Sequence, residues 1–208
     1  MYPPVDSKEN YFCEEYSDYY YFPSRFAYNK RQHLVIEALK YAKGNFKVIM
    51  TGQIEEKYFR NYIKPLLNDP QINQRLEIME YVDETIKRKL YARAIAVIFT
   101  PFDEDYGYVT LEAFYSSKSV ITVNNSGACL EFVQNNKTGI VCKPSPESIA
   151  KAMDFLYENK SIAIQMGKNA KQFIEGKNIS WEHTIQRIIN YNPIQKIINS
   201  IFSWFPNK

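Results

Sequence analysis

The sequence has few of the residues that build disulfide frameworks, metal sites and catalytic histidine pairs. Its 208 residues include three cysteines and two histidines. The number of cysteines is odd, and no two of Cys13, Cys129 and Cys142 have the spacing of metal ligands. We therefore expect reduced thiols and no metal site. His33 and His183 have no visible partner in the sequence, which makes a catalytic role the less favoured interpretation of each.

Long apolar runs and a strong charge of one sign are also missing. No apolar stretch approaches the ~20 residues that a transmembrane helix needs, and the N-terminus lacks the basic and apolar regions of a signal peptide. The net charge of +3 and the lack of an arginine-rich run argue against a nucleic-acid partner. A hydrophobic content of 45% is ordinary, so we expect a cytoplasmic globular protein with a sizeable core.

Short apolar segments alternate with amphipathic segments along most of the chain. The apolar segments predict strands over 19–24, 46–50, 76–81, 94–99, 119–123 and 140–142. The amphipathic segments predict helices over 30–43, 55–68, a segment after Asp83, a segment from Gly107 to about 117, 127–134, 146–158, 160–175, 180–190 and 194–204. Asn29 and Asp83 are the expected N-caps of two of these helices. The alternation predicts an α/β fold, a Rossmann-like parallel sheet of about six strands with flanking helices.

Two segments fall outside this alternation. Residues 1–18 are polar, acidic and proline-bearing, and indicate a linker or extended arm, whereas 19–192 form the predicted domain. Residues 193–208 predict an amphipathic helix whose apolar face consists of Ile194, Ile197, Ile198, Ile201, Phe202 and Phe205. That face could pack on the domain's own core, dock on another protein half or make peripheral contact with a membrane surface, although only Lys196 and Lys208 would support the last option.

Two glutamates, Glu104 and Glu112, follow the strand predicted over 94–99. Glu104 lies in the loop after that strand, and Glu112 lies one turn inside the helix that begins after Gly107. Loops at the carboxyl ends of parallel strands bind ligands in open α/β sheets, and the N–H groups at a helix start attract phosphate. A carboxylate in the same place can accept hydrogen bonds from sugar hydroxyls. The arrangement therefore predicts a nucleotide-sugar site.

Two cations, Arg25 and Lys30, flank the loop after the first predicted strand. They could clamp a diphosphate, the arginine as a planar fork and the lysine as a point charge, although ordinary surface charges on a solvated loop are the alternative. Neither G-x-G-x-x-G nor G-x-x-x-x-G-K-S/T occurs, which argues against a nicotinamide dinucleotide site and a Walker-type site.

Together these motifs resemble the C-terminal, donor-binding half of a GT-B glycosyltransferase of family 4. That family carries two glutamates separated by seven residues, an EX7E motif, with an aromatic residue and a glycine shortly after the first. Here the motif runs from Glu104 to Glu112 and contains Tyr106 and Gly107. The other matching segments are YPPVD at 2–6, SRF at 24–26 with Lys30, SVITVN at 119–124, SGACLEFV at 126–133 and NKTGIV at 136–141.

The resemblance implies a role for each matching position. Arg25 and Lys30 would bind the diphosphate, and Glu104 would contact the donor sugar or the leaving phosphate, which makes these three the expected catalytic residues. Glu112 would hold the ribose hydroxyls. The donor-binding set implied by the resemblance is Arg25, Lys30, Gly52, Tyr81, Val82, Glu104, Gly107, Tyr108, Val109 and Glu112. No metal and no cofactor is expected beyond the nucleotide-sugar substrate.

The sequence departs from the family pattern at single positions and in its extent, and the loop before Glu131 has one glycine where the family often has two. Ser24 and Glu80 stand where the family has glycines, and Glu80 could narrow or recharge the base pocket that Tyr81 and Val82 are expected to line. The larger departure is that the chain matches only the donor-binding half, whereas the family builds its acceptor site on an N-terminal half.

The resemblance thus predicts the donor half of a retaining transferase. It would move a hexosyl group, with mannosyl and glucosyl as candidates, from a UDP- or GDP-sugar to an acceptor. The isolated chain would be inactive without an N-terminal half or partner subunit. A non-catalytic subunit that supports such a half is the alternative, and a sugar-nucleotide epimerase of GT-B shape would need the absent half as well.

Overall fold

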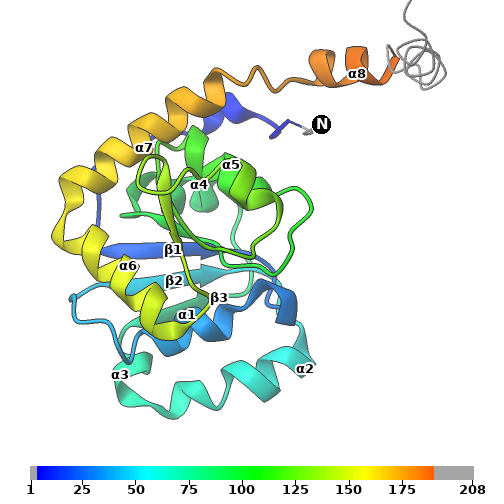
Figure 1. Cartoon of the computed structure of the whole chain (residues 1–208). Helices are drawn as coiled ribbons and strands as arrows, with labels where there is room; N and C mark the ends of the chain where they lie inside the picture. Colours follow the sequence, from blue (N-terminus) through cyan, green and yellow to red (C-terminus); the bar gives the residue numbers. More distant parts are fainter. Residues whose placement is uncertain (1–3, 190–208) are drawn as a thin grey trace, which may run out of the picture. The chain divides into compact units, whose positions relative to one another are not determined.

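The computed structural model of the chain describes residues 4–189, and a six-stranded sheet forms its centre (Figure 1). The strands are β1 (Tyr19–Pro23), β2 (Lys47–Thr51), β3 (Leu76–Met79), β4 (Val97–Ile98), β5 (Val120–Val123) and β6 (Gly139–Cys142). Their order is β3-β2-β1-β4-β5-β6, and every neighbouring pair is parallel. The predicted α/β fold, with a parallel sheet of about six strands, is confirmed.

The strand order reverses between β1 and β4. From β1 the chain extends the sheet through β2 and β3 on one side, and from β4 through β5 and β6 on the other. In open α/β sheets such a reversal leaves a crevice outside the carboxyl ends of the two central strands. The loops after β1 and β4 meet there, since the Phe102 N–H donates to the Asn29 carbonyl at 2.7 Å.

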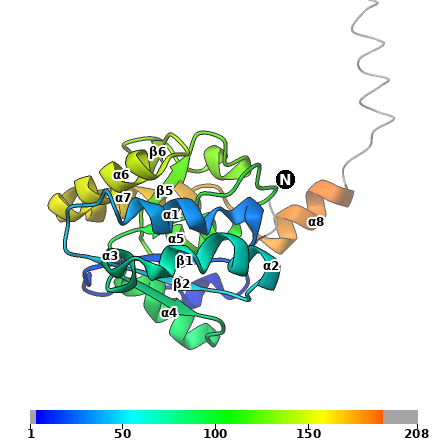
Figure 2. The same cartoon turned by 90° about the horizontal axis from the view of Figure 1, so that it is seen from below.

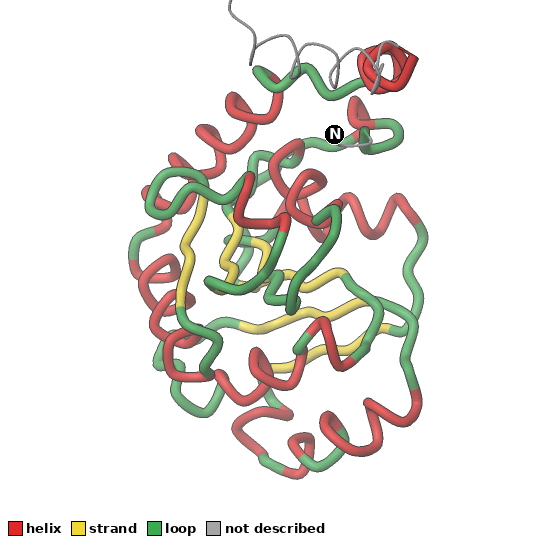
Figure 3. Tube along the Cα trace, turned by 45° about the vertical axis from the view of Figure 1, so that its right-hand side comes forward, coloured by secondary structure: helices red, strands yellow, loops and turns green. Residues whose placement is uncertain are grey.

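Helices cover both faces of the sheet, with α4, α5 and α7 above it and α1, α2 and α3 below it in Figure 1. Figure 3 shows the strands at the centre of this arrangement. The described α-helices are α1 (Gln32–Ala38), α2 (Glu56–Tyr58), α3 (Pro70–Asn73), α4 (Glu84–Arg93), α5 (Tyr108–Tyr115), α6 (Pro146–Glu158), α7 (Lys160–Glu175) and α8 (Trp181–Ile189). Tyr20, Tyr21 and Phe22 in β1 are each 0% exposed, because a central parallel strand is buried on both sides.

Sequence signals set the starts of two helices. Ser145 caps α6, where its Oγ accepts from the Ser148 N–H at 3.3 Å, and Pro146 takes the first helical position. Asp83 caps α4 as predicted, since its Oδ1 accepts from the Ile86 N–H at 2.8 Å. Helix α4 therefore begins just beyond the carboxyl end of β3.

The predicted cap of the first helix was wrong. Helix α1 is preceded by Arg31, which has a φ of 60° and makes no side-chain cap hydrogen bond. Asn29 lies earlier, in the 3₁₀ turn η2 (Tyr28–Lys30), where its carbonyl is used by the loop after β4. Arg31 instead donates from Nη1 to Asn125 Oδ1 at 2.8 Å. Contacts between distant loops thus override the local capping signal.

The helix predicted over 55–68 is broken. It consists of α2, a π-helical turn η3 (Phe59–Ile63) and a 3₁₀ turn η4 (Leu66–Asn68), and η3 lies beside α1 (Figure 2). Pro65, which lacks a backbone N–H, separates the last two turns. The strand predicted over 94–99 is also shorter, because only Val97 and Ile98 pair as β4. A further 3₁₀ turn, η5 (Ala128–Glu131), replaces the helix predicted over 127–134.

The segment before β1, here called the N-terminal arm (residues 5–18), lies against the sheet within the same compact unit. It contains the 3₁₀ turn η1 (Lys8–Asn10), and its Val5 and Tyr11 are only 7% and 5% exposed. The Glu14 N–H donates to the Ala92 carbonyl at the end of α4, at 2.9 Å. The arm is therefore part of the packed structure.

The chain divides into two compact units. One is Val5–Lys177, which contains the sheet, and the other is Met1–Pro4 with Asn178–Lys208, whose described part includes α8. The domain boundaries placed at 18/19 and 192/193 stay predictions. The amphipathic helix predicted over 193–208 lies outside the described residues.

Candidate functional site

A cavity of about 580 Å³ lies at the carboxyl ends of β1, β2 and β3. Its walls come from the loops after these strands, the first turn of α4 and the start of α5. The lining residues are Pro23, Ser24, Arg25, Thr51, Gly52, Gln53, Glu80, Tyr81, Val82, Lys87, Tyr108, Val109 and Glu112. Most of the donor-binding set inferred from the sequence is therefore brought together in one place.

Gly52 allows the loops after β1 and β2 to touch. Its φ of 147° lies in a region that favours glycine, and a Cβ there would lie 2.2 Å from the Ser24 carbonyl oxygen. Just beyond, Phe26 and Ile54 form an isolated parallel bridge. This edge of the cavity therefore depends on direct contact between two backbones, which a larger residue would push apart.

Two donors hold the carboxylate of Glu112 at the wall of the cavity. Tyr91 donates its hydroxyl hydrogen to Oε2 at 2.6 Å, and Lys87 Nζ donates to Oε1 at 2.8 Å. The Glu112 side chain is 14% exposed, so its orientation is fixed by these bonds. An ionised carboxylate offers about four lone-pair sites, which leaves about two for the hydroxyl groups of a ligand.

Lys87 is a cavity residue that the sequence reasoning missed. Besides Glu112, its Nζ contacts Glu84 Oε1 at 3.3 Å. Burial lowers the pKa of Lys87, but the two carboxylates more than compensate, so its pKa is raised overall and it stays charged. The signal that could have found it is its place in the first turn after Asp83, where a helix follows a strand at the ligand-binding edge of the sheet.

Two tyrosines enclose the other side of Glu112. Tyr91 is 0% exposed and packs edge-on against Tyr11 of the N-terminal arm, with ring centroids 5.9 Å apart. Burial, followed by the adjacent Glu112, raises the pKa of both hydroxyls, so both remain protonated donors. The arm thus contributes to the surroundings of Glu112, which no motif in the sequence indicates.

Lys30 and Glu104 form an ion pair of their own. Their side chains are 16% and 18% exposed, and Lys30 Nζ lies 5.6 Å from the centroid of the Phe99 ring. Neither residue lines the cavity, whereas Arg25 does. The two cations expected to clamp a diphosphate are therefore engaged differently: Lys30 is neutralised by a carboxylate, and Arg25 is exposed to solvent.

The backbone around Glu104 is fixed by the loop after β5. The Glu104 N–H donates to the Ser126 carbonyl at 3.3 Å, and the Glu104 carbonyl accepts from the Ala128 N–H at 2.7 Å. Gly127, with a φ of 65°, makes this possible, because a Cβ there would lie 2.5 Å from the Glu104 nitrogen. The position of Glu104 is thus set independently of the ion pair that its side chain makes.

Helix α5 presents its amino end to the cavity. Gly107 precedes the helix with a φ of 65° and supplies no side-chain acceptor for the first turn. The first N–H groups of a helix have no partner within the helix, and they favour anions. Tyr108 and Val109, which open α5, line the cavity. Their N–H groups could hold a phosphate without displacing an existing side-chain cap.

Tyr81 and Val82 line the cavity at its β3 side, as expected for a base pocket. Tyr81 is 85% exposed, so its ring is free to stack on a planar group. Glu80 lies beside them and adds a carboxylate to this part of the wall. The departure noted in the sequence thus falls inside the cavity.

Metal-binding clusters and membrane spans were sought over residues 4–189. Within that range, no group of three or more His, Cys, Asp or Glu side chains could hold a metal ion. No helix in the same range has the length and apolar character needed to cross a membrane.

Comparison with known families decides where the domain belongs. The family model described as glycosyl transferases group 1 matches residues 7–173. The chain belongs to this family. The resemblance drawn from the EX7E motif and its neighbouring segments is therefore confirmed.

Curated glycosyltransferases are similar to this chain over part of their length. Alpha-1,3/1,6-mannosyltransferase ALG2 from Homo sapiens is 26% identical over 167 residues, which are 74% of this chain and 40% of that protein. The protein of the same name from Dictyostelium discoideum is 31% identical over 127 residues, which are 61% of this chain and 30% of that protein. This group 1 glycosyl transferase chain thus spans less than half the length of these relatives.

Solved structures show the same fold. The C-terminal domain of LpcC, a group 1 family protein from Francisella tularensis, matches with a TM-score of 0.69 at 19% identity, over 85% of this chain and 94% of that domain. HepE from Anabaena, in complex with UDP and glucose, matches with a TM-score of 0.72 at 21% identity, over 83% of this chain and 47% of that chain. The fold is therefore that of one half of a GT-B glycosyltransferase.

Proposed function

We propose that the cavity binds a nucleoside diphosphate sugar and that the chain is the donor-binding half of a retaining glycosyltransferase. The observation that carries this proposal is that Arg25, the start of α5 and the carboxylate of Glu112 converge on one cavity. A cation and a helix start suit a diphosphate, and a carboxylate with free lone pairs suits a ribose diol. Tyr81 and Val82 supply a surface for the base.

The proposed roles follow from these positions. Arg25 and the N–H groups at the start of α5 hold the diphosphate, and Glu112, oriented by Lys87 and Tyr91, accepts from the ribose hydroxyls. Cleavage of the glycosidic bond leaves negative charge on the departing diphosphate. Donors that are already in place for that charge lower the barrier without reorganisation.

We place the donor sugar beside the ion pair between Lys30 and Glu104, because the family resemblance assigns both residues to the donor site. A diphosphate carries more negative charge than one carboxylate, so it can compete with Glu104 for the ammonium group of Lys30. Lys30 would then stabilise the leaving group, and Glu104 would be released to accept from a sugar hydroxyl. Arg25, Lys30 and Glu104 are thus the proposed catalytic residues.

Several facts support a hexosyl donor and a second half. The curated relatives include mannosyltransferases, and the matched HepE structure contains UDP and glucose, so we propose transfer of a mannosyl or glucosyl group from a UDP- or GDP-sugar. The acceptor would bind to an N-terminal half or partner subunit, without which the chain would be inactive. The free thiols of Cys13, Cys129 and Cys142 favour the cytoplasm.

A non-catalytic subunit is the second candidate, and one observation favours it. Both glutamates of the motif are already paired with lysines, Glu112 with Lys87 and Glu104 with Lys30, and Glu80 places a further carboxylate near the base surface. A domain with these pairs could keep the fold, leave the cavity unused and serve only to support a separate half.

Titration calorimetry with UDP, GDP and ADP distinguishes the two candidates. The donor-binding proposal expects saturable binding of UDP or GDP, weakened about tenfold or more by Arg25→Ala, because one charge-assisted contact is worth roughly 1.5–3 kcal/mol. Arg60→Ala is the matched control, since Arg60 is also exposed and does not line the cavity. If none of the three nucleotides binds at millimolar concentration, the subunit without a working site is favoured.

A further inference from the structure

An arginine with a left-handed backbone follows Lys30 directly in the sequence. Arg31 has a φ of 60° and a ψ of 35°, a conformation that costs free energy in any residue with a Cβ. Residues stay in this conformation when their contacts compensate, and such residues gather at functional sites. Asp103, which directly precedes Glu104, also has a positive φ, of 49°. Both members of the Lys30–Glu104 ion pair are therefore next to a residue with an uncommon backbone.

The side chain of Arg31 connects the loops that follow three strands. Arg31 itself belongs to the loop after β1. Its Nη1 donates to Asn125 Oδ1, on the loop after β5, at 2.8 Å, and its Cζ lies 4.8 Å from the centroid of the Phe102 ring, on the loop after β4. A guanidinium group suits this place, because it can stack on an aromatic ring while it donates from its edge. These two contacts are here called the Arg31 bridge.

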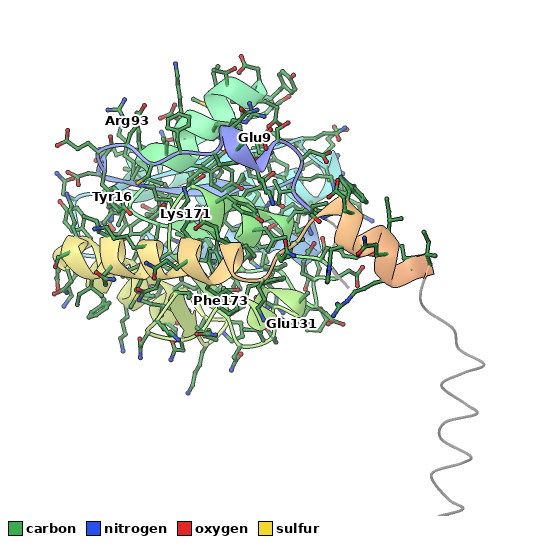
Figure 4. All side chains as sticks on the ribbon, turned by 90° about the horizontal axis from the view of Figure 1, so that it is seen from above. Glu9, Tyr16, Arg93, Glu131, Lys171 and Phe173 are labelled. Carbon is green, nitrogen blue, oxygen red and sulfur yellow. The ribbon has the colours of Figure 1, made fainter. Side chains whose placement is uncertain are left out.

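The loops after β4 and β5 are also joined to one another. The Ser126 hydroxyl donates to the Pro101 carbonyl at 3.0 Å, and the Ser126 carbonyl accepts from the Glu104 N–H at 3.3 Å. The loop after β5 then continues into η5, whose last residue, Glu131, is labelled in Figure 4. Glu104 is thus attached to the loop after β5, and the Arg31 bridge connects the loop after β1 to the same pair of loops.

Lys30 lies between two anchored residues of the loop after β1. Before it, the Asn29 carbonyl accepts from the Phe102 N–H at 2.7 Å, and after it, Arg31 makes its bridge. Both anchors lead to the pair of loops that carries Glu104. The ion pair between Lys30 and Glu104 therefore forms between two backbones that other contacts hold in place.

We propose that Arg31 is a positioning residue, which holds Lys30 and Glu104 where the donor needs them. This inference rests on the proposed function, in which a diphosphate draws the Lys30 ammonium group away from Glu104. That exchange requires only side-chain movement if the backbones of both loops stay in place. Groups that are already positioned bind an arriving charge without reorganisation, so loss of the Arg31 bridge lowers the affinity for the diphosphate. Arg31 acts through its neighbours, since it does not line the cavity.

The primary test is titration calorimetry with UDP and GDP on Asn125→Ala. This variant removes the acceptor of the Arg31 guanidinium group and leaves every charge in place. If Arg31 acts by position, the affinity should fall about threefold or more, which is the size of a coupling between residues in contact. If Arg31 instead attracts the ligand through its charge, release from Asn125 should leave the affinity unchanged or raise it, and either result would overturn the proposal.

A double-mutant cycle tests which groups Arg31 positions. Arg31→Gly removes the bridge and keeps a residue that adopts a positive φ without cost. Its loss of affinity should be about threefold or more in the wild-type background, and it should disappear when Lys30→Met and Glu104→Gln have already neutralised the ion pair. The loss should persist in the Arg25→Ala background. An undiminished loss in the neutralised background would overturn the proposal.

Asn136→Gly is the matched control for the glycine substitution. Asn136 has a φ of 60°, equal to that of Arg31, and it is exposed on the loop before β6. It does not line the cavity, so glycine relieves a similar backbone cost at a position away from the proposed site. The affinity of this control for UDP and GDP should equal that of the wild-type chain. A loss as large as that of Arg31→Gly would overturn the proposal.

Amide hydrogen exchange needs no ligand, so it separates a failure of this inference from a failure of the proposed function. The N–H groups of Phe102 and Glu104 donate between loops, and both should exchange severalfold faster in Arg31→Gly and Asn125→Ala than in the wild-type chain. Asn125→Ala covers the case in which Arg31→Gly does not fold. Unchanged exchange in the folded variants would overturn the inference. If the wild-type chain binds neither UDP nor GDP, the proposed function fails, whereas the exchange rates still decide whether Arg31 positions the two loops.

Discussion

Replacing Glu112 with alanine should weaken the binding of a nucleoside diphosphate while the domain stays folded. The carboxylate lies at the cavity wall, and it is held by Lys87 and Tyr91 rather than by solvent. Truncation removes the acceptor that the ribose hydroxyls would use. Lys87 retains a carboxylate partner, since Glu84 lies 3.3 Å from its Nζ.

The expected magnitude follows from the hydrogen bonds that the carboxylate can make. Lys87 and Tyr91 each take one acceptor position, and about two remain for a ligand. One charge-assisted hydrogen bond contributes roughly 1.5–3 kcal/mol, which corresponds to about a 10- to 100-fold change in Kd. The buried Tyr91 hydroxyl also loses its acceptor, so the free energy of unfolding should fall by roughly 1–3 kcal/mol.

The assay is titration calorimetry with UDP and then GDP on the wild-type chain and three variants. Glu112→Gln keeps the shape and one acceptor oxygen, so its affinity should fall between those of wild type and Glu112→Ala. Glu84→Ala is the matched control, because Glu84 contacts the same lysine from a position where its side chain is 59% exposed. The control should change Kd by less than about twofold.

Two results would refute this reasoning. A folded Glu112→Ala variant with wild-type affinity would mean that Glu112 does not contact the nucleotide. Equal losses in Glu112→Ala and Glu84→Ala would mean that the affinity depends on the surroundings of Lys87 rather than on direct contact. Circular dichroism and a urea titration of each variant show whether a loss of affinity comes from unfolding.

Three further predictions concern the backbone, a half-buried histidine and the isolated chain. Gly52→Ala should lower the free energy of unfolding in urea by roughly 1–3 kcal/mol or more, because the φ of Gly52 is 147° and the new Cβ would meet the Ser24 carbonyl. Gly176→Ala is the control and should have little effect, because the φ of Gly176 is not positive and the nearest atom to its new Cβ would be 3.4 Å away. Burial and then Arg31 lower the pKa of His33 in the folded chain, so the unfolded chain binds the imidazole proton more tightly. The free energy of unfolding should therefore fall as the pH drops through about 6.5, and His33→Phe should reduce that fall. The isolated chain should transfer no sugar in a radiolabelled-donor assay, because under the proposed function it would hold only one of two reactants, and turnover near ~1–10³ per second would contradict that interpretation.

The sheet and much of the helical pattern could be read from the sequence, because they depend on neighbours within a few residues. The apolar run in β1 predicts a buried strand, and the amphipathic segment that begins at Pro146 predicts the helix α6 over 146–158, as the structure has it. The family motifs also placed Arg25 and Glu112 at the ligand-binding edge, where both line the cavity. Their roles there stay predictions.

What the sequence could not determine is how these residues are paired. Lys30 and Glu104 are 74 positions apart, and Lys87 and Glu112 are 25 apart, so their contacts exist only once the loops after different strands converge. The cap expected at Asn29 failed for the same reason, because its carbonyl is used by the loop after β4. Local periodicity and capping fix the strands and helices, since both act over a few residues. The partners of each charge, and the place of Tyr11 beside Glu112, are decided only by tertiary packing, which brings distant residues together.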